Sequence, residues 1–168
     1  MKNILLLFLI VISIDAIADT WKFPKEVTSH EYDFGDVKVV TKRDGTKNQI
    51  MPVYTVEIYR EGNLQALYKG ISFDHVAADK QNAVFVGISN RGLPGTAIVI
   101  FDGFGNLKLL RNHNKKLFEY CSWSTTIDRT WYDYKNPDLK VIYNDAGIPT
   151  TIQVNSCKGK AIDILKNI

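Results

Sequence analysis

Residues Ala97 to Leu107 read Ala-Ile-Val-Ile-Phe-Asp-Gly-Phe-Gly-Asn-Leu. The first five are apolar and include three β-branched side chains, which is typical of a short β-strand with little exposed surface. The Asp, Gly and Asn residues that follow favour a turn, because glycine readily adopts the positive φ that tight reversals need. The stretch therefore predicts a strand that ends at Phe101 and turns back into a second apolar run.

The same arrangement occurs twice more, in Val56–Leu64 and in Lys140–Ile148. The aromatic residues that close the three strands, Tyr59, Phe101 and Tyr143, are each 42 residues apart. This spacing matches the length of a β-propeller blade. However, the 150 residues from Asp19 to Ile168, which follow the apolar N-terminal run, hold only about three and a half such units, fewer than the four or more that close a propeller. The pattern therefore fits either a true repeat or a β-meander whose hairpins look alike.

Further strands are predicted at Val37–Thr41, Val53–Tyr59 and Val84–Ile88, and helical periodicity is scarce. Short helices are expected at most at Thr125–Tyr132 and around Asp74–Lys80. The expected fold is all-β: a single antiparallel domain built as a curved meander, a sandwich or a propeller-like fragment of repeated hairpins.

The first eighteen residues have the layout of a secretory signal peptide. Lys2 precedes an apolar run from Ile4 to Ile14, and the small residues Ala16 and Ala18 lie where a signal peptidase reads. The run is too short to span a bilayer as a permanent anchor. We therefore expect residues 1–18 to be removed and residues 19–168 to form one β-rich domain in the periplasm or outside the cell.

Export also decides how the two cysteines are interpreted. Cys121 and Cys157 are the only pair, and an oxidising compartment favours a disulfide between them. The chain has no Cys-x-x-Cys motif and no histidine close to either cysteine, which speaks against a redox or nucleophilic role. We expect the disulfide to tie the segment at Cys121 to a last hairpin, Ile152–Leu165.

Charge and motifs exclude several classes of function. The net charge of +3 is too small to indicate a nucleic-acid binder. The three histidines are far apart and show no metal-ligand spacing, so neither a metal nor a cofactor is expected. Residues Gly87–Arg91 approach a serine-hydrolase elbow, but Arg91 replaces the final glycine and a Gly/Pro-rich loop follows instead of a helix.

Carboxylates leave one enzymatic alternative open. Glycosidases use two carboxyl groups on either side of the scissile bond, and a sequence does not show which carboxylates converge. In turns, aspartates such as Asp102 usually bind their own backbone. The alternative is therefore an envelope hydrolase that acts on glycan or peptide. The acidic residues considered include Glu26, Glu31, Asp33, Asp36, Glu57, Asp74, Asp102, Glu119, Asp128, Asp133, Asp138 and Asp145.

Exposed loops and aromatic residues are the best candidates for a binding surface. Asn90–Gly95 is a connection rich in glycine and proline, Arg111–Lys116 is a polar and basic run, and several aromatic residues surround Arg129. Core filling is the competing interpretation for Trp123 and Trp131. The residues expected to contact a partner are Arg91 and Leu93 as an inserted tip, Arg111, His113, Lys115 and Lys116 as a charged rim, and Tyr132 and Tyr134.

These observations favour a secreted or periplasmic protein that binds another protein and acts by contact, without chemistry of its own. The format of leader, single β domain and one disulfide resembles that of several periplasmic immunity proteins, although no motif is shared residue by residue. This resemblance implies an inhibitor that blocks a secreted toxin or a cell-wall hydrolase.

Overall fold

The computed structural model describes residues 22–79, 83–90, 95–116, 118–123, 129–144 and 149–167. These residues form an all-β fold with one short 3₁₀ turn at the C-terminal end, η1 (Leu165–Asn167). The strands are β1 (Val27–Asp33), β2 (Val37–Asp44), β3 (Val53–Arg60), β4 (Asn63–Lys69), β5 (His75–Ala78), β6 (Phe85–Ile88), β7 (Thr96–Phe101), β8 (Leu107–Asn112), β9 (Lys140–Tyr143), β10 (Pro149–Asn155) and β11 (Ala161–Asp163).

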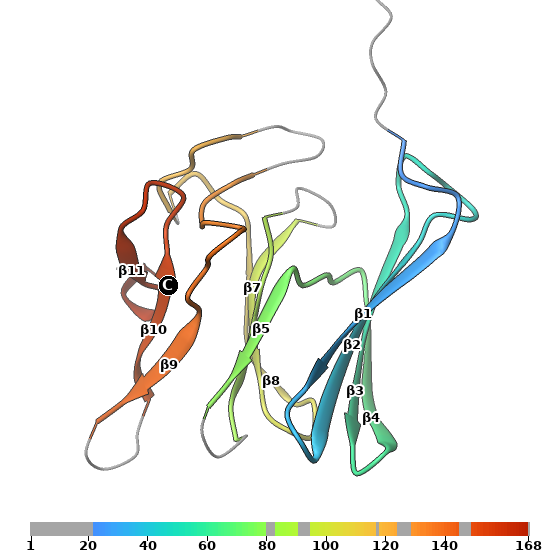
Figure 1. The fold of residues 1–168 in the computed structure, drawn as a ribbon, viewed down its shortest axis with the longest axis horizontal. Coiled ribbons are helices and arrows are strands. Elements are labelled where there is room, and N and C mark those ends of the chain that lie inside the picture. The colour runs from blue at the N-terminus through green and yellow to red at the C-terminus, as the bar shows by residue number, and fades with distance from the viewer. Residues whose placement is uncertain are drawn as a thin grey trace, which may run out of the picture.

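The strands form three antiparallel sheets. The first sheet has the order β1-β2-β3-β4, the second β5-β6-β7-β8 and the third β11-β10-β9. Each of the first two sheets is a simple meander, in which every strand pairs with the next strand along the chain. Figure 1 shows the second sheet between the other two. The expected antiparallel all-β fold of repeated hairpins is confirmed.

The second sheet contributes to two hydrophobic cores. Phe85, Val99 and Phe101 pack in the core shared with the first sheet, whereas Val86 and Ile98 pack in the core shared with the third. Successive side chains of a strand point to opposite faces, so one apolar strand can serve both cores. This explains why the sequence of β6 and β7 is apolar at nearly every position instead of alternating.

The predicted strands are confirmed at Val37–Thr41, Val53–Tyr59, Val84–Ile88 and Ala97–Phe101 to within a few residues, and at Lys140–Tyr143. The helix expected around Asp74–Lys80 is wrong, because residues 75–78 pair with β6 as strand β5. The helix expected at Thr125–Tyr132 lies partly outside the described residues. Its described part, from Arg129 on, is not helical, and Tyr132 forms an isolated bridge with Ser156.

The 42-residue spacing has a structural counterpart in the first two sheets. Tyr59 lies near the end of β3 and Phe101 ends β7, and each of these strands is the third of its sheet. Tyr143 ends β9, which lies at the edge of the three-stranded sheet. A hydrogen bond between residues 42 positions apart also links the first sheet to the start of the second: the hydroxyl of Tyr32 in β1 donates to the carbonyl of Asp74, just before β5, at 2.7 Å.

The disulfide between Cys121 and Cys157 is present, as predicted. Cys157 lies in the turn between β10 and β11, so the bond joins the segment before residue 124 to the last hairpin. Trp131 fills the core beside this segment: it is fully buried, its ring stacks on Phe118 at 4.0 Å, and its indole N–H donates to the carbonyl of Ser89 at 3.0 Å.

The proposed signal peptide, residues 1–18, lies outside the described residues. Within the ranges given above, no helix has the length and apolar character required to cross a membrane.

Candidate functional site

A basic and aromatic cluster follows β8 on the surface. Trp123 lies at its centre, with the Lys115 ammonium 5.4 Å and the Arg129 guanidinium 5.0 Å from the centre of its ring. Tyr120 packs edge-on against Trp123, and its hydroxyl accepts a hydrogen bond from the backbone of Asn114 at 3.2 Å. We call this set the basic–aromatic edge: Arg111, His113, Lys115, Lys116, Tyr120, Trp123 and Arg129.

The two residues that flank positions 91–94 are fixed to this edge. The backbone N–H of His113 donates to the carbonyl of Gly95 at 2.7 Å, and the backbone N–H of Arg129 donates to the carbonyl of Asn90 at 2.9 Å. The connection predicted to carry the inserted tip therefore ends beside His113, a residue predicted for the charged rim, and starts beside Arg129, which was not among the predicted contact residues. Nothing in the sequence spacing required the connection and the edge to meet.

The individual predictions have different outcomes. Arg91 and Leu93 lie outside the described residues. Arg111, Lys115 and Lys116 are exposed, and His113 is half-buried against Tyr120. Tyr132 is fully buried, so its prediction as a contact residue is wrong: its hydroxyl lies 3.3 Å from the Asp74 carboxylate inside the fold. Tyr134 is 52% exposed, but it lies at a different place, which is described next.

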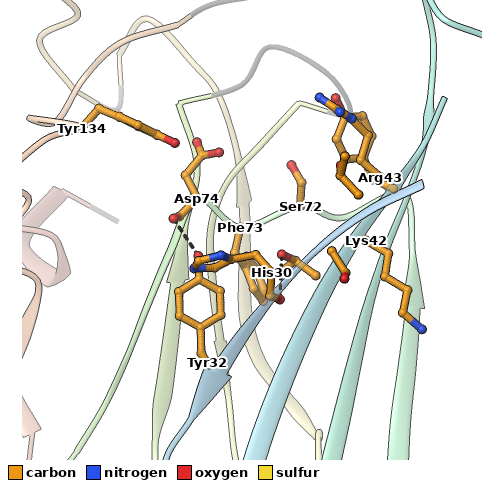
Figure 2. A pocket seen from close by; sticks show the side chains of 12 residues that line it. His30, Tyr32, Lys42, Arg43, Ser72, Phe73, Asp74 and Tyr134 are labelled. Carbon is orange, nitrogen blue, oxygen red and sulfur yellow. Dashed lines mark hydrogen bonds between the residues drawn. The ribbon is translucent and has the colours of Figure 1, made fainter. Parts of the chain in front are cut away.

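A cavity of about 260 Å³ opens between the edge of the first sheet and the chain that leads into β5 (Figure 2). We call it the Ser72 cavity. Figure 2 shows Ser72 between Asp74 on one side and Arg43 on the other, with Tyr134 beyond Asp74. The cavity is lined by Thr28, Ser29, His30, Tyr32, Thr41, Lys42, Arg43, Tyr54, Ser72, Phe73, Asp74 and Tyr134.

Asp74 joins the Ser72 cavity to the basic–aromatic edge. One of its carboxylate oxygens accepts hydrogen bonds from the backbone N–H of Asn90 at 2.8 Å and from the hydroxyls of Ser89 and Tyr132 at 3.3 Å. The amide of Asn90 continues this network, since its Nδ2 donates to the Tyr132 carbonyl and its Oδ1 accepts from the Trp131 N–H. Asp74 therefore holds the N-terminal flank of the 91–94 connection in place.

The aromatic and histidine side chains near Asp74 have shifted pKa values. Burial and the Asp74 charge both raise the pKa of Tyr32, and they act in the same direction on Tyr132. Burial lowers the pKa of His75, and the Asp74 carboxylate offsets this only in part. The His75 ring donates through Nε2 to the carbonyl of Tyr134 at 3.0 Å. At neutral pH these groups act as neutral hydrogen-bonding partners rather than as charged acids or bases.

The outer face of the first sheet carries a second hollow, of about 370 Å³, and it is where acidic residues gather. Strand register places Glu31, Val40, Glu57 and Leu67 in one row across the four strands. Cations accompany the acidic side chains: Lys42 is 2.6 Å from Glu57, Lys38 is 3.2 Å from Glu31, and Arg60 pairs with Asp36 at the end of β3.

Glu57 is one of the carboxylates that line this hollow, and hydrogen bonds from Lys42 and Tyr59 lower its pKa. A general acid needs the opposite shift, because it must keep its proton near neutral pH. Among the described carboxyl groups, every resolved pKa shift is downward, namely those of Asp44, Glu57, Asp102 and Glu119. The hollow thus resembles a charged contact surface more than a glycosidase cleft.

Sequence reasoning did not identify Ser72, Arg43 or Asp74 as a group, because no motif links them and the fold alone brings them together. Arg129 and Trp123 were easier to recognise as candidates for a binding surface, because arginine and tryptophan are common in protein interfaces and both residues lie close in sequence to the basic run Arg111–Lys116. In the described part of the chain, no group of three or more His, Cys, Asp or Glu side chains is placed to hold a metal ion. No family model, curated protein or solved structure matches this chain, so function must be argued from its own geometry.

Proposed function

We propose that this chain is an exported protein-binding module that acts by contact, as an inhibitor or immunity protein of a secreted toxin or cell-wall hydrolase. Its contact surface is the basic–aromatic edge together with the connection through Arg91 and Leu93. One observation carries the proposal: Asn90 and Gly95, on either side of that connection, are hydrogen-bonded to Arg129 and His113 of the edge.

The chemistry of the edge suits a protein partner. Tryptophan, tyrosine and arginine contribute most of the binding energy in protein interfaces, and Trp123, Tyr120 and Arg129 are packed together here. Exposed lysines around such a centre steer an acidic partner and set its orientation. A hydrolase cleft lined with carboxylates is an acidic surface of this kind.

A capture experiment with matched charge variants tests the proposal. The protein, purified after export, is used as bait in envelope extract from its own organism, and bound proteins are identified by mass spectrometry. The test bait is Lys115→Glu/Lys116→Glu, on the edge. The control bait is Lys25→Glu/Lys69→Glu, which changes the net charge equally at exposed positions elsewhere.

We expect one stoichiometric partner with the wild-type and control baits, and at least tenfold less of it with the edge variant. Loss of a hydrolytic activity of that partner in the complex would identify the inhibitor function. Equal recovery with both variants would contradict the proposed surface. Absence of any partner at micromolar bait, together with turnover of glycan or peptide by the protein itself, would favour the hydrolase alternative.

A further inference from the structure

We propose that the Ser72 cavity is a second, separate site, which binds a small molecule through a carboxylate or phosphate group. The first observation is the hydroxyl of Ser72. Its residue is only 5% exposed, the side chain lines the cavity, and Oγ has no hydrogen-bond partner. A buried polar atom without a partner is costly and uncommon in a native fold, so a ligand or ordered water in the cavity is its natural partner.

Arg43 supplies the charge. Arg43 lines the cavity, and its guanidinium lies 5.0 Å from the centre of the ring of Phe23, a residue outside the lining. The Nε atom of Arg43 is buried and has no hydrogen-bond partner. An arginine and a serine in the lining of one cavity are donors suited to an oxyanion, because the guanidinium carries charge and both groups can donate to oxygen.

The other charged groups of the lining, Lys42 and Asp74, have partners of their own. The Lys42 ammonium binds Glu57 on the outer face of the sheet, and Figure 2 shows its side chain leading away from Ser72. The single carboxylate of the lining, Asp74, already accepts hydrogen bonds from Ser89, Asn90 and Tyr132. His30 adds a further nitrogen donor to the lining. The lining therefore combines the Arg43 cation with hydroxyl and imidazole groups that can donate hydrogen bonds, which favours an anion as the occupant.

The size and the remaining lining limit the ligand. A volume of about 260 Å³ lies below the roughly 300–1,000 Å³ typical of sites for drug-sized molecules. It nevertheless leaves room beyond the oxyanion for a compact organic body. Hydroxyls of Thr28, Ser29 and Thr41 and the ring of Tyr134 surround that space, so a small polar acid fits better than an apolar one.

An NMR titration of the ¹⁵N-labelled protein, purified after export, tests this site. Sodium phosphate and sodium acetate are the two probes, and sodium chloride at equal ionic strength is the control salt. The signals followed are the Arg43 Nε–Hε group and the backbone amide of Ser72. Ser72→Ala and Arg43→Lys are the test variants. Ser122→Ala, at an exposed position, and Arg60→Lys, at the end of β3, are their matched controls outside the cavity.

We expect a saturable shift of both signals with at least one oxyanion and none with chloride. Ser72→Ala and Arg43→Lys should each weaken binding at least fivefold, whereas the control variants should bind as the wild type does. A response to phosphate alone would identify a phosphoryl ligand, and a response to acetate alone a carboxylate. No saturable shift with either anion, or the same affinity in both test variants, would overturn the proposal.

Discussion

Asp74 shows how a single residue links distant parts of this molecule. Its side chain accepts hydrogen bonds from Ser89, Asn90 and Tyr132, and its backbone carbonyl accepts one from Tyr32 of the first sheet. The carboxylate therefore holds together the second sheet, the segment after residue 129 and the start of the 91–94 connection. A hydrogen bond to a charged acceptor contributes more than one between neutral groups.

Replacement of Asp74 by alanine should lower the free energy of unfolding by about 2–4 kcal/mol, because it leaves the Asn90 N–H and the Tyr132 hydroxyl buried without their acceptor. Tyr132→Phe removes one donor only and should cost about 0.5–1.5 kcal/mol. Urea unfolding of both variants measures the difference. An Asp74→Ala variant no less stable than Tyr132→Phe would show that Asp74 does not organise this region.

The same residue explains where prediction from sequence failed. Tyrosine is a common interface residue, but Tyr132 packs in the core beside Trp131, and its hydroxyl finds a partner 58 positions earlier in the chain. The Ser72 cavity was not predictable for the same reason: Arg43, Ser72 and Tyr134 come from three separate segments. By contrast, the run from Arg111 to Lys116 is continuous in sequence, and its exposed lysines could be identified before the fold was known.

At the scale of strands, burial on two faces made the second sheet predictable. β6 and β7 are apolar at nearly every position, so their strand character shows in the sequence. β1 was not predicted, because it is an edge strand with mostly exposed side chains and little apolar pattern. β5 has only four residues and is defined by its pairing with β6, which depends on tertiary structure rather than on local propensity.

The β7–β8 hairpin is stabilised by Asp102 in its turn. The Asp102 carboxylate accepts hydrogen bonds from the backbones of Phe104 and Asn106 and pairs with Lys108 at 3.1 Å. Burial alone would raise the pKa of Asp102, but the hydrogen bonds from Asn106 and Phe104 and the pairing with Lys108 outweigh it and lower the pKa to about 2. A carboxyl group with a lowered pKa stabilises the fold above its unfolded pKa near 4, and this contribution is lost as the pH falls toward 2.

We therefore expect Asp102→Ala to cost about 1–2 kcal/mol of stability at pH 7 after allowance for solvent screening. The difference from wild type should shrink between pH 4 and pH 2, as the wild-type carboxylate takes up its proton. Chemical denaturation at a series of pH values measures this. A penalty that stays constant down to pH 2 would mean that the ionised form of Asp102 is not what stabilises the turn.

For the whole molecule, three sheets share two cores, and the second sheet contributes to both. The chain between β8 and β9 contains no described strand, yet it carries Phe118 and Trp131 into the core of the third sheet. The disulfide from Cys121 to Cys157 anchors this segment to the last hairpin. The segment also carries Trp123 and Arg129, so the disulfide supports the basic–aromatic edge.

Loss of the disulfide in Cys121→Ser/Cys157→Ser should lower the free energy of unfolding by about 3–4 kcal/mol. The two cysteines are 36 positions apart in the sequence, and without the bond the loop between them is no longer closed in the unfolded chain. Thermal and urea unfolding, compared with the wild type before and after reduction by dithiothreitol, measure the effect. The reduced wild type and the double variant should behave alike. Equal stability of the oxidised and reduced proteins would rule out this structural role.

The central claim is that the protein acts by contact through the connection at Arg91 and Leu93 and the adjoining basic–aromatic edge. Its most direct test is the affinity of the captured partner for Arg91→Ala/Leu93→Ala, measured by calorimetry beside the melting temperature of the variant. We predict binding more than tenfold weaker than that of the wild type with an unchanged melting temperature. A variant that melts at a lower temperature but binds as tightly as the wild type would contradict the claim.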